Sequence, residues 1–254
     1  MSESLEILPV QGLPEVREGD AVGRLIAAAL DDHGDRLGDG DVVCISQKAV
    51  SKAEGRVRRL AEVEPGPEAH ELAEELGKDP RLVELILRES ARLVRAERGV
   101  LITETRQGWV CANAGIDSSN VPGEGAVTLL PVDADASARR LRSELAEATG
   151  ARAAVVISDS FGRPWRLGQT EVAIGCAGLA PVDDWRGRVD STGRELSATA
   201  IAVADELAAA ADLVRDKASG VPAVLIRGAG RHVLEDDGPG ASVLRRAAGD
   251  DLFR

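Results

Sequence analysis

Two aspartates that follow apolar runs are the residues best suited to do chemistry in this sequence. Asp117 lies in the stretch ANAGIDSSNVPGEG, directly after the run WVC, and Asp159 closes the run AAVVISD. Magnesium and manganese prefer hard oxygen ligands, usually one or two carboxylates together with phosphate oxygens and water. Asp117 and Asp159 would supply such ligands if the fold brings them together. The alternative is structural, because Asp commonly ends strands and begins turns.

Basic side chains near these acids could neutralise an anionic ligand. Lys48 and Lys52 come just after a predicted buried strand, and Arg163 and Arg166 lie in the stretch SFGRPWRLGQT. Guanidinium groups on a loop stiffened by Gly and Pro are suited to binding phosphate or carboxylate. The alternatives are a solvated basic turn for the two lysines and, for the arginines, a surface loop with Trp165 packed inward.

Sequence motifs of several common sites are absent. No Lys is followed by Ser or Thr, as a Walker A loop requires, no GxGxxG follows a strand, and no HExxH occurs. The three histidines are scattered along the chain. A zinc site built from histidines or a Ser–His–Asp triad therefore has little support.

The composition excludes several classes of protein. The chain has 254 residues, of which 44% are hydrophobic and 29% charged, and this balance indicates a globular protein with an aliphatic core, since aromatic residues make up only 2%. The net charge of −12 argues against nucleic acid as a partner. A small phosphate ligand stays compatible with this charge, because a metal ion or a local arginine cluster can override the global sign.

The cysteines and the N-terminus indicate a reducing compartment. Cys44, Cys111 and Cys176 are far apart, lie in or beside apolar runs, and form no CxxC motif, so we expect buried, reduced thiols. The N-terminal stretch has no signal-peptide pattern, and no window of 18 apolar residues predicts a membrane span. The expected location is cytoplasmic, without a membrane.

Strands and helices are mixed along the chain without regular alternation. Strands are predicted at 5–10, 42–46, 126–132, 152–160 and 221–228, with a hairpin at 99–113. Helices are predicted at 21–33 with Asp20 as N-cap, at 67–76, at 79–93, at 136–150, at 194–216 and in a short final segment from 241. This pattern favours an α+β fold over a doubly wound sheet.

Six segments occur in the order seen in one known family. They read GLPEV, SKAEGR, NAGIDSSNV, SDSFGRPWRLGQTEVAIGCAGL, DWRGRVDSTGREL and GVPAVLIRG. Together they resemble the coenzyme F420-0:γ-glutamyl ligases from about residue 7 to residue 228. The chain also resembles the N-terminal half of the actinobacterial two-domain version, in which a nitroreductase-like domain follows.

The resemblance implies a GTP-dependent reaction. In that family the γ-phosphoryl group of GTP moves to the terminal carboxylate of F420-0, and the amino group of L-glutamate attacks the acyl phosphate. Further γ-linked glutamates are added to F420-1. Two divalent ions, Mg²⁺ or Mn²⁺, and K⁺ assist. A site of acids, lysines and metals suits phosphoryl transfer, which depends on charge neutralisation rather than on a histidine base.

The resemblance also implies roles for individual residues. Asp117 and Asp159 match catalytic metal ligands, Ser160 lies at the second ion, and Asp216 is the candidate to complete the second metal site. The matching nucleotide-binding residues are Leu13, Pro14, Glu15, Val16, Gln47, Lys48, Lys52 and Asn120. Lys52 is expected to reach a phosphate during catalysis.

Fold and partners follow from the same resemblance. It implies one ligase domain over 1–254, built from two interlocked α+β subdomains with a C-terminal extension at 229–254, and an intertwined homodimer. Two other functions stay open from the residues alone. One is a metal-dependent phosphotransferase that acts on another carboxylate, and the other is a non-catalytic module that binds a deazaflavin or a nucleotide.

Overall fold

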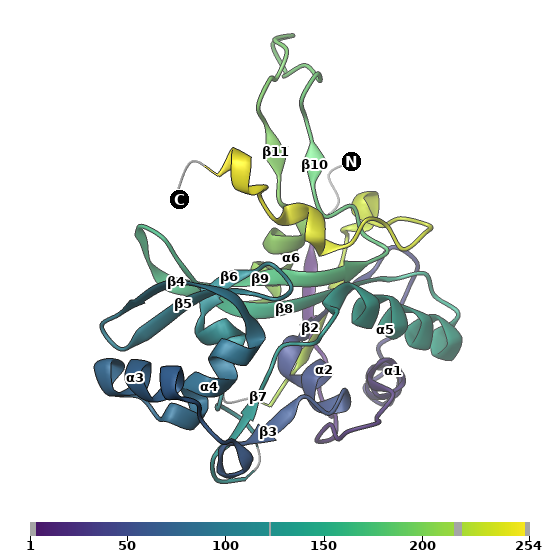
Figure 1. The fold of residues 1–254 in the computed structure, drawn as a ribbon. Coiled ribbons are helices and arrows are strands. Elements are labelled where there is room, and N and C mark those ends of the chain that lie inside the picture. Colours follow the sequence, from purple (N-terminus) through teal and green to yellow (C-terminus); the bar gives the residue numbers. More distant parts are fainter. Residues whose placement is uncertain (1–3, 122, 216–219, 252–254) are drawn as a thin grey trace.

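A five-stranded sheet forms the centre of the computed structural model, which describes residues 4–121, 123–215 and 220–251 (Figure 1). The strand order is β1-β12-β2-β8-β9. The strands are β1 Glu6–Pro9, β2 Val42–Ser46, β8 Ala154–Arg163, β9 Arg166–Ala177 and β12 Ala223–Arg227. In this sheet β2 and β8 are parallel, and the other neighbours are antiparallel. The predicted α+β class is confirmed.

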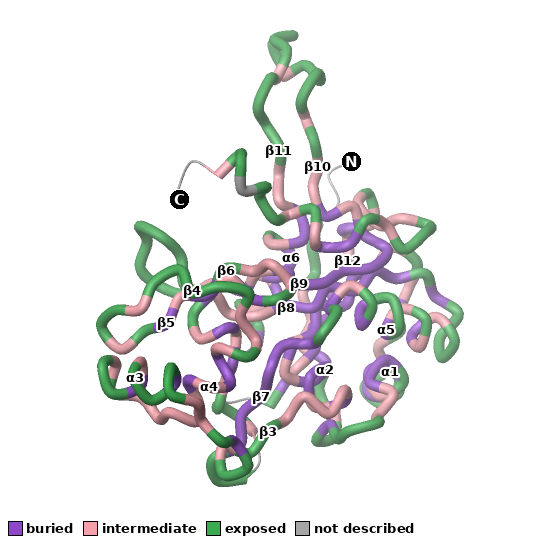
Figure 2. Tube along the Cα trace, viewed as in Figure 1, coloured by how far each residue is buried: buried purple, intermediate pink, exposed green. Residues whose placement is uncertain are grey.

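Helices cover both faces of this sheet, because its inner strands are apolar on both sides. The covering helices are α1 Val22–Asp32, α2 Gln47–Ala53, α5 Ala134–Thr149 and α6 Val203–Asp212. Ile45 and Ile157 pack into the cluster with α1, α2 and α5, while Cys44 and Val156 pack into the cluster with α6. The buried strands between these helices are visible in Figure 2.

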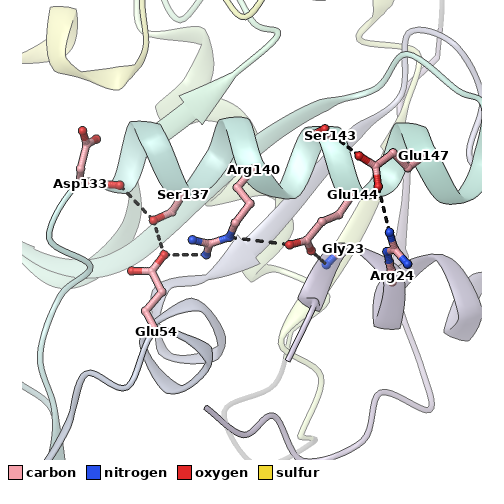
Figure 3. Close-up of polar contacts among 9 residues, drawn as sticks. All are labelled: Gly23, Arg24, Glu54, Asp133, Ser137, Arg140, Ser143, Glu144 and Glu147. Carbon is pink, nitrogen blue, oxygen red and sulfur yellow. Dashed lines mark hydrogen bonds and ion pairs between the residues drawn. The ribbon is translucent and has the colours of Figure 1, made fainter. Parts of the chain in front are cut away.

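Hydrogen bonds and ion pairs of charged side chains connect α5 with α1 and with the end of α2 (Figure 3). The Glu144 carboxylate accepts a hydrogen bond of 2.7 Å from the backbone N–H of Gly23 in α1. Arg140 pairs at 2.7 Å with Glu54, the residue that follows α2. A Cβ atom on Gly23 would lie 2.7 Å from the Cβ of Glu144, so this helix approach requires glycine. These contacts fix α2 relative to the sheet.

A second layer lies beside the central sheet. It contains a three-stranded sheet in the order β4-β5-β6, a two-stranded ribbon of β3 and β7, and two helices. The elements are β3 Val57–Arg59, α3 Pro67–Leu76, α4 Pro80–Glu89, β4 Ser90–Glu97, β5 Val100–Thr105, β6 Val110–Ala112 and β7 Ala126–Thr128. Ile86, Leu101 and Val127 belong to its own apolar cluster. The predicted hairpin at 99–113 corresponds to β5 and β6 and is confirmed.

A hairpin arm projects away from both layers (Figure 1). Its paired strands are β10 Asp183–Asp184 and β11 Ala200–Ile201, and most of the residues between them are exposed (Figure 2). Short 3-10 turns occur at Leu60–Glu62, Asn113–Gly115, Gly230–His232, Ala241–Leu244 and Ala248–Asp250. Within the described ranges no helix has both the length and the apolar character to cross a bilayer.

Three predicted helices have different boundaries in the structure. The helix predicted at 194–216 begins only at Val203, because the residues before it belong to the hairpin arm. The helix predicted at 79–93 ends at Glu89, and the next residues form β4, paired with β5. The final helix predicted from 241 is replaced by two 3-10 turns, and residues 252–254 lie outside the described part. Pairing with other segments overrode local helical periodicity in the second case.

Other predicted details are also corrected. Asp20 does not cap α1: the N-cap is Ala21, and the Asp20 carboxylate accepts a hydrogen bond from the N–H of Arg17 at 2.7 Å. β8 does not end at Asp159 but continues to Arg163, because β9 pairs with it from Val155 as far as Arg163. The strand predicted at 126–132 is shorter, with pairing only at 126–128.

Candidate functional site

A cavity of about 520 Å³ opens at one edge of the central sheet. The carboxyl ends of β1, β2 and β8 meet there with the amino ends of β9 and β12, as their pairing directions require. Ligands often bind where loops leave the carboxyl ends of strands in such sheets. The lining residues are Leu13, Pro14, Glu15, Val16, Ser46, Lys48, Ala49, Lys52, Asp117, Asn120, Val121, Asp159, Ser160, Glu171, Asp212, Arg215, Gly220, Val221 and Pro222.

Asp117 is held at the cavity by its own backbone. Its N–H donates to the carbonyl of Thr128 at 3.1 Å, and its carbonyl accepts from the N–H of Thr128 at 2.8 Å. Its carboxylate accepts a hydrogen bond of 2.7 Å from the N–H of Ser119, which is the geometry of an Asx turn. Asn120 then has φ +56°, a left-handed conformation that Asn tolerates better than most residues. The loop is thus both a turn and part of the cavity.

Lys48 brings a positive charge onto this carboxylate. Its Nζ lies 2.8 Å from Oδ2 of Asp117 and donates to the Ser119 hydroxyl at 2.6 Å. Burial by itself would raise the pKa of Asp117, but the hydrogen bonds and charge of Lys48 and the Ser119 N–H outweigh burial and lower the pKa. Asp117 is therefore ionised at neutral pH.

Asp159 has the opposite electrostatic environment. Burial, reinforced by the negative charges of Glu171 and Asp117, raises the pKa of Asp159 to about 7, against smaller opposing effects of the Ser160 N–H and Lys48. Cys111 is also buried, and its burial together with the charge of Asp159 raises the pKa of its thiol to about 12. This cysteine is therefore an unreactive core residue. At Asp159, the negative charges of Glu171 and Asp117 therefore outweigh the positive charge of Lys48.

A buried ion pair forms the neighbouring wall. Glu171 and Arg215 approach to 2.7 Å between Oε2 and Nη2, and their side chains are only 6% and 8% exposed. The Ser160 hydroxyl donates to Oε1 of Glu171 at 2.5 Å, so its proton is committed and its oxygen lone pairs stay available to a ligand. Nη1 of Arg215 is buried and has no hydrogen-bond partner in the described part of the chain, which leaves one donor available to a ligand.

Sequence reasoning missed Glu171 and Arg215. Glu171 opens an apolar run, and Arg215 follows an Ala-rich helix, so neither stands in a recognisable motif. Only the pairing of Ser160 with Glu171 across β8 and β9 identifies the first of them. Knowledge of the register of that hairpin would have identified Glu171. The register depends on a β-bulge, which the sequence pattern does not predict.

The N-terminal segment forms the other wall. Residues 13–16 all line the cavity, as the resemblance led us to expect of a nucleotide-binding segment. Lys52 of α2 pairs with Glu15 at 2.6 Å, and its side chain is only 13% exposed. Lys52 and Lys48 are one turn apart on α2, so both ammonium groups are delivered to the cavity by the same helix.

Three predicted site residues of the described part are not among the cavity-lining residues. Gln47 is buried in the first turn of α2, where its Oε1 accepts from the Ser51 hydroxyl at 2.8 Å. Arg163 and Arg166 face each other at the exposed end of the β8–β9 hairpin. Asp216 lies outside the described residues. The structural alternative for this loop, with Trp165 packed inward, is wrong in that detail, because the residue is 77% exposed at the hairpin turn.

The oxygen-rich wall fits a hard divalent cation. Within the described residues, no three His, Cys, Asp or Glu side chains are already arranged as a metal-binding group. The donors that do meet there are the carboxylates of Asp117 and Asp159 and the hydroxyl of Ser160, which are the atom types that Mg²⁺ and Mn²⁺ prefer. The raised pKa of Asp159, caused by burial and by neighbouring acids, is what an added cation would relieve.

The fold and this cavity define a class of protein: an α+β chain whose central sheet gathers two aspartates and two lysines in one cavity. The chain belongs to the F420-0:gamma-glutamyl ligase family, whose profile matches residues 12–228. The family resemblance seen in the sequence is therefore confirmed.

Individual relatives match over almost the whole chain. The coenzyme F420:L-glutamate ligase of Methanothermobacter thermautotrophicus is 49% identical over 98% of this chain and 99% of its own length. The ligase of the same name from Methanopyrus kandleri is 46% identical, covering 99% and 98%. That of Archaeoglobus fulgidus is 42% identical, covering 98% and 96%.

Proposed function

We propose that this protein is a GTP-dependent ligase that joins L-glutamate to coenzyme F420-0 and adds further γ-linked glutamates to F420-1. The observation that carries the proposal is the meeting of Asp117, Asp159 and Lys48 in one cavity. The family and the names of the relatives supply the substrates, coenzyme F420 and L-glutamate. Dependence on GTP is supported by Lys48 and Lys52 and by residues 13–16, which resemble the nucleotide-binding segment of the family and line the cavity.

The proposed reaction has two steps. The terminal carboxylate of F420-0 attacks the γ-phosphorus of GTP, which forms an acyl phosphate and releases GDP. The amino group of L-glutamate then attacks the acyl carbon. The C–N bond forms, the C–O bond to phosphate breaks, inorganic phosphate leaves, and the amino group loses its extra protons to solvent.

The chain's own residues orient the reactants. In this proposal Lys48 and Lys52 hold phosphate oxygens, and Asn120 with residues 13–16 positions the nucleotide; the support is that all of them line the cavity. Ion pairs to Asp117 and Glu15 hold both lysines in place before the ligand arrives, so little ordering is left for the reaction itself.

Two divalent ions, Mg²⁺ or Mn²⁺, are proposed for the oxygen-rich wall. Asp117, Asp159 and Ser160 would hold them, with Asp216 as the further proposed ligand. Bound there, such ions supply neutralisation of phosphate charge. K⁺ is proposed as an additional activator. Glu171 keeps the Ser160 hydroxyl turned so that its lone pairs remain free.

The assembly and the division of the chain are proposed as well. We propose an intertwined homodimer in the cytoplasm. The layer built on β4, β5 and β6, which has its own apolar cluster, is proposed as the second subdomain. In a longer form of the protein, a nitroreductase-like domain would be the fused partner.

The direct test is a reconstitution with GTP, Mn²⁺, K⁺, L-glutamate and F420-0. The expected result is GDP together with a product heavier by one glutamyl residue, detected by mass spectrometry. Lys48→Met should raise the KM for GTP, while Arg95→Met, on the exposed face of β4, should leave it unchanged. Absence of both GDP and the mass increase would exclude the ligase. Phosphoryl transfer that does not need F420-0 would indicate a phosphotransferase, and tight F420 binding without GTP turnover would indicate a binding module.

A further inference from the structure

A second hollow, of about 470 Å³, lies between the β5–β6 turn, the segment that leads into α5, and the segment 239–245. It shares no lining residue with the cavity at the sheet edge. A neighbouring hollow between β5, α4 and the segment after β7 shares Arg106, Gln107 and Val132 with it. The two hollows therefore adjoin, and we call them together the arginine trough.

Arginines gather around the trough. Arg106, Arg139 and Arg245 line its first part, and Arg56 and Arg88 line its second part, where they pair with Glu89 and Glu84 at 2.6 and 2.7 Å. The whole chain carries a net charge of −12, so a hollow with three arginines and two acids is a departure from the rest of the surface. Within the described part of the chain, no carboxylate pairs with any of the three arginines of the first part.

The acids of the first part are already engaged by backbone amides. Asp135 accepts hydrogen bonds from the N–H groups of Cys176, Ala241 and Ser242 at 2.9, 2.7 and 3.3 Å. The carboxylate of Asp133 caps α5 by accepting from the N–H of Ala136 at 2.9 Å. These acids are oriented toward backbone donors, so the three guanidinium groups remain available to an external anion.

One arginine is fixed in position before any ligand binds. The Arg245 guanidinium donates to the carbonyls of Ser242 and Gln107, and its carbon lies 5.7 Å from the centre of the Trp109 ring. Gly108, at φ +88°, makes this possible, because a Cβ atom there would lie 2.6 Å from Nη1 of Arg245. A pre-oriented cation beside an aromatic ring lowers the ordering cost of binding.

We propose that the arginine trough binds the anionic part of the acceptor that does not react. This inference rests on the proposed function, in which the acceptor gains one free carboxylate with every glutamate added. A depression made of two adjoining hollows, lined by several guanidinium groups, suits a chain of carboxylates, or a phosphate group on the same molecule, better than a single small ion. The nucleotide is then held in the first cavity and the acceptor's charged part in the trough.

The test uses Trp109 as a reporter of binding. The chain has three tryptophans, so Trp165→Phe and Trp185→Phe together leave Trp109 as the fluorophore. The probes are tri-γ-L-glutamate and, separately, inorganic tripolyphosphate. We expect a saturable change in fluorescence that weakens as salt is raised. Arg106→Glu and Arg139→Glu should each weaken binding about fivefold.

A matched control makes the same change of charge elsewhere. Arg98 lies at the β4–β5 turn, and its side chain is 90% exposed. The Arg98→Glu variant should bind both probes as tightly as the parent protein does. Saturation by the peptide alone identifies carboxylates as the recognised groups, and saturation by tripolyphosphate alone identifies phosphate. If neither probe saturates, or if Arg139→Glu binds as tightly as the control, the inference is wrong.

Failure of the inference and failure of the proposed function give different results. Saturable binding in a chain that shows no glutamate ligation would contradict the proposed function and leave the trough as an anion site. Full ligation by Arg139→Glu, with unchanged probe affinity and unchanged lengths of glutamate tail, would contradict the trough assignment and leave the proposed function intact.

Discussion

Asp159 in the cavity and Asp184 in the projecting arm are the same residue type in opposite surroundings. Burial and neighbouring acids raise the pKa of Asp159 to about 7. The exposed Asp184 accepts hydrogen bonds from the side chain and the backbone N–H of Arg186, and these lower its pKa to about 2. The identity of a side chain therefore says little about its charge until its burial and neighbours are known.

The ion pairs of the two regions differ in the same way. Glu171 and Arg215 are almost fully removed from solvent, whereas Asp184 and Arg186 approach to 2.5 Å with side chains that are 45% and 63% exposed. Water screens the exposed pair, so breaking it should cost little. Breaking the buried pair leaves an unpaired charge in the interior. We therefore expect substitutions in the cavity wall to destabilise the protein and substitutions in the arm to have little effect on stability.

The largest effect is expected for Asp159→Asn. The change keeps the shape of the side chain but removes the charge that would bind a cation and organise phosphate transfer. Glutamate ligation should fall by about 10²- to 10³-fold with the fold retained. Product formation is measured by mass spectrometry and folding by circular dichroism. Asp184→Asn is the control and should keep the parent rate; a parent-like rate in Asp159→Asn would remove this residue from the reaction.

The next effect concerns the stability of the cavity wall. Arg215→Met should lower the free energy of unfolding by about 3–5 kcal/mol, because Glu171 is left buried without its partner. The double change Arg215→Met with Glu171→Leu should recover most of that loss. Urea unfolding measures both. If the double variant is no more stable than the single one, the unpaired charge is not the cause.

A pH dependence should distinguish the two aspartates in chelator-treated protein. The folded-state pKa of Asp159, about 7, lies above the ordinary value of 3.8, so the folded protein holds its proton where the unfolded chain has lost it. Asp159 should therefore make the unfolding free energy fall between about pH 4 and pH 7, by a few kcal/mol. Asp159→Asn should show a smaller decline over this window. Identical slopes for the variant and its parent would contradict the pKa assignment.

The same reasoning gives the opposite sign for the arm. The pKa of Asp184 is lowered in the folded protein, so any contribution it makes is present above pH 4 and is lost as pH falls through about 2. Asp184→Asn should thus leave the slope between pH 4 and pH 7 unchanged.

The smallest effect is expected for Arg186→Ala. Its partner Asp184 is exposed, and solvent replaces the lost contact. The melting temperature should stay within about 1 °C of the parent value in a differential scanning experiment. A drop as large as that of Arg215→Met would show that the arm is not the tolerant region.

Local patterns in the sequence predicted most of the elements that frame the site. The buried strand at 42–46, the strand at 221–228 and the cap of α4 by Asp79, whose carboxylate accepts from the N–H of Arg81 at 2.8 Å, are all present. These features depend on residues that are close together in the chain, so they can be predicted from the sequence alone. The helix predicted through Leu93 is wrong, because pairing of β4 with β5 is a long-range contact that periodicity does not record.

The site was predictable only in part for the same reason. Asp117, Asp159, Ser160, Lys48 and Lys52 were found because short motifs and a family resemblance mark them, and the structure brings all five to one cavity. Glu171 and Arg215 carry no such mark, and neither do the residues of the arginine trough. Their importance arises from contacts between segments that are distant in the chain.

By itself, the sequence determined the α+β composition, the aliphatic core, the apolar strands, the family and the acids and lysines available for chemistry. The tertiary structure decided which of those groups meet, which are buried and which carry charge at neutral pH. The physical reason is that strand and helix propensities act between near neighbours, whereas the pKa of Asp159 depends on burial and on Glu171, which the β8–β9 hairpin brings to it.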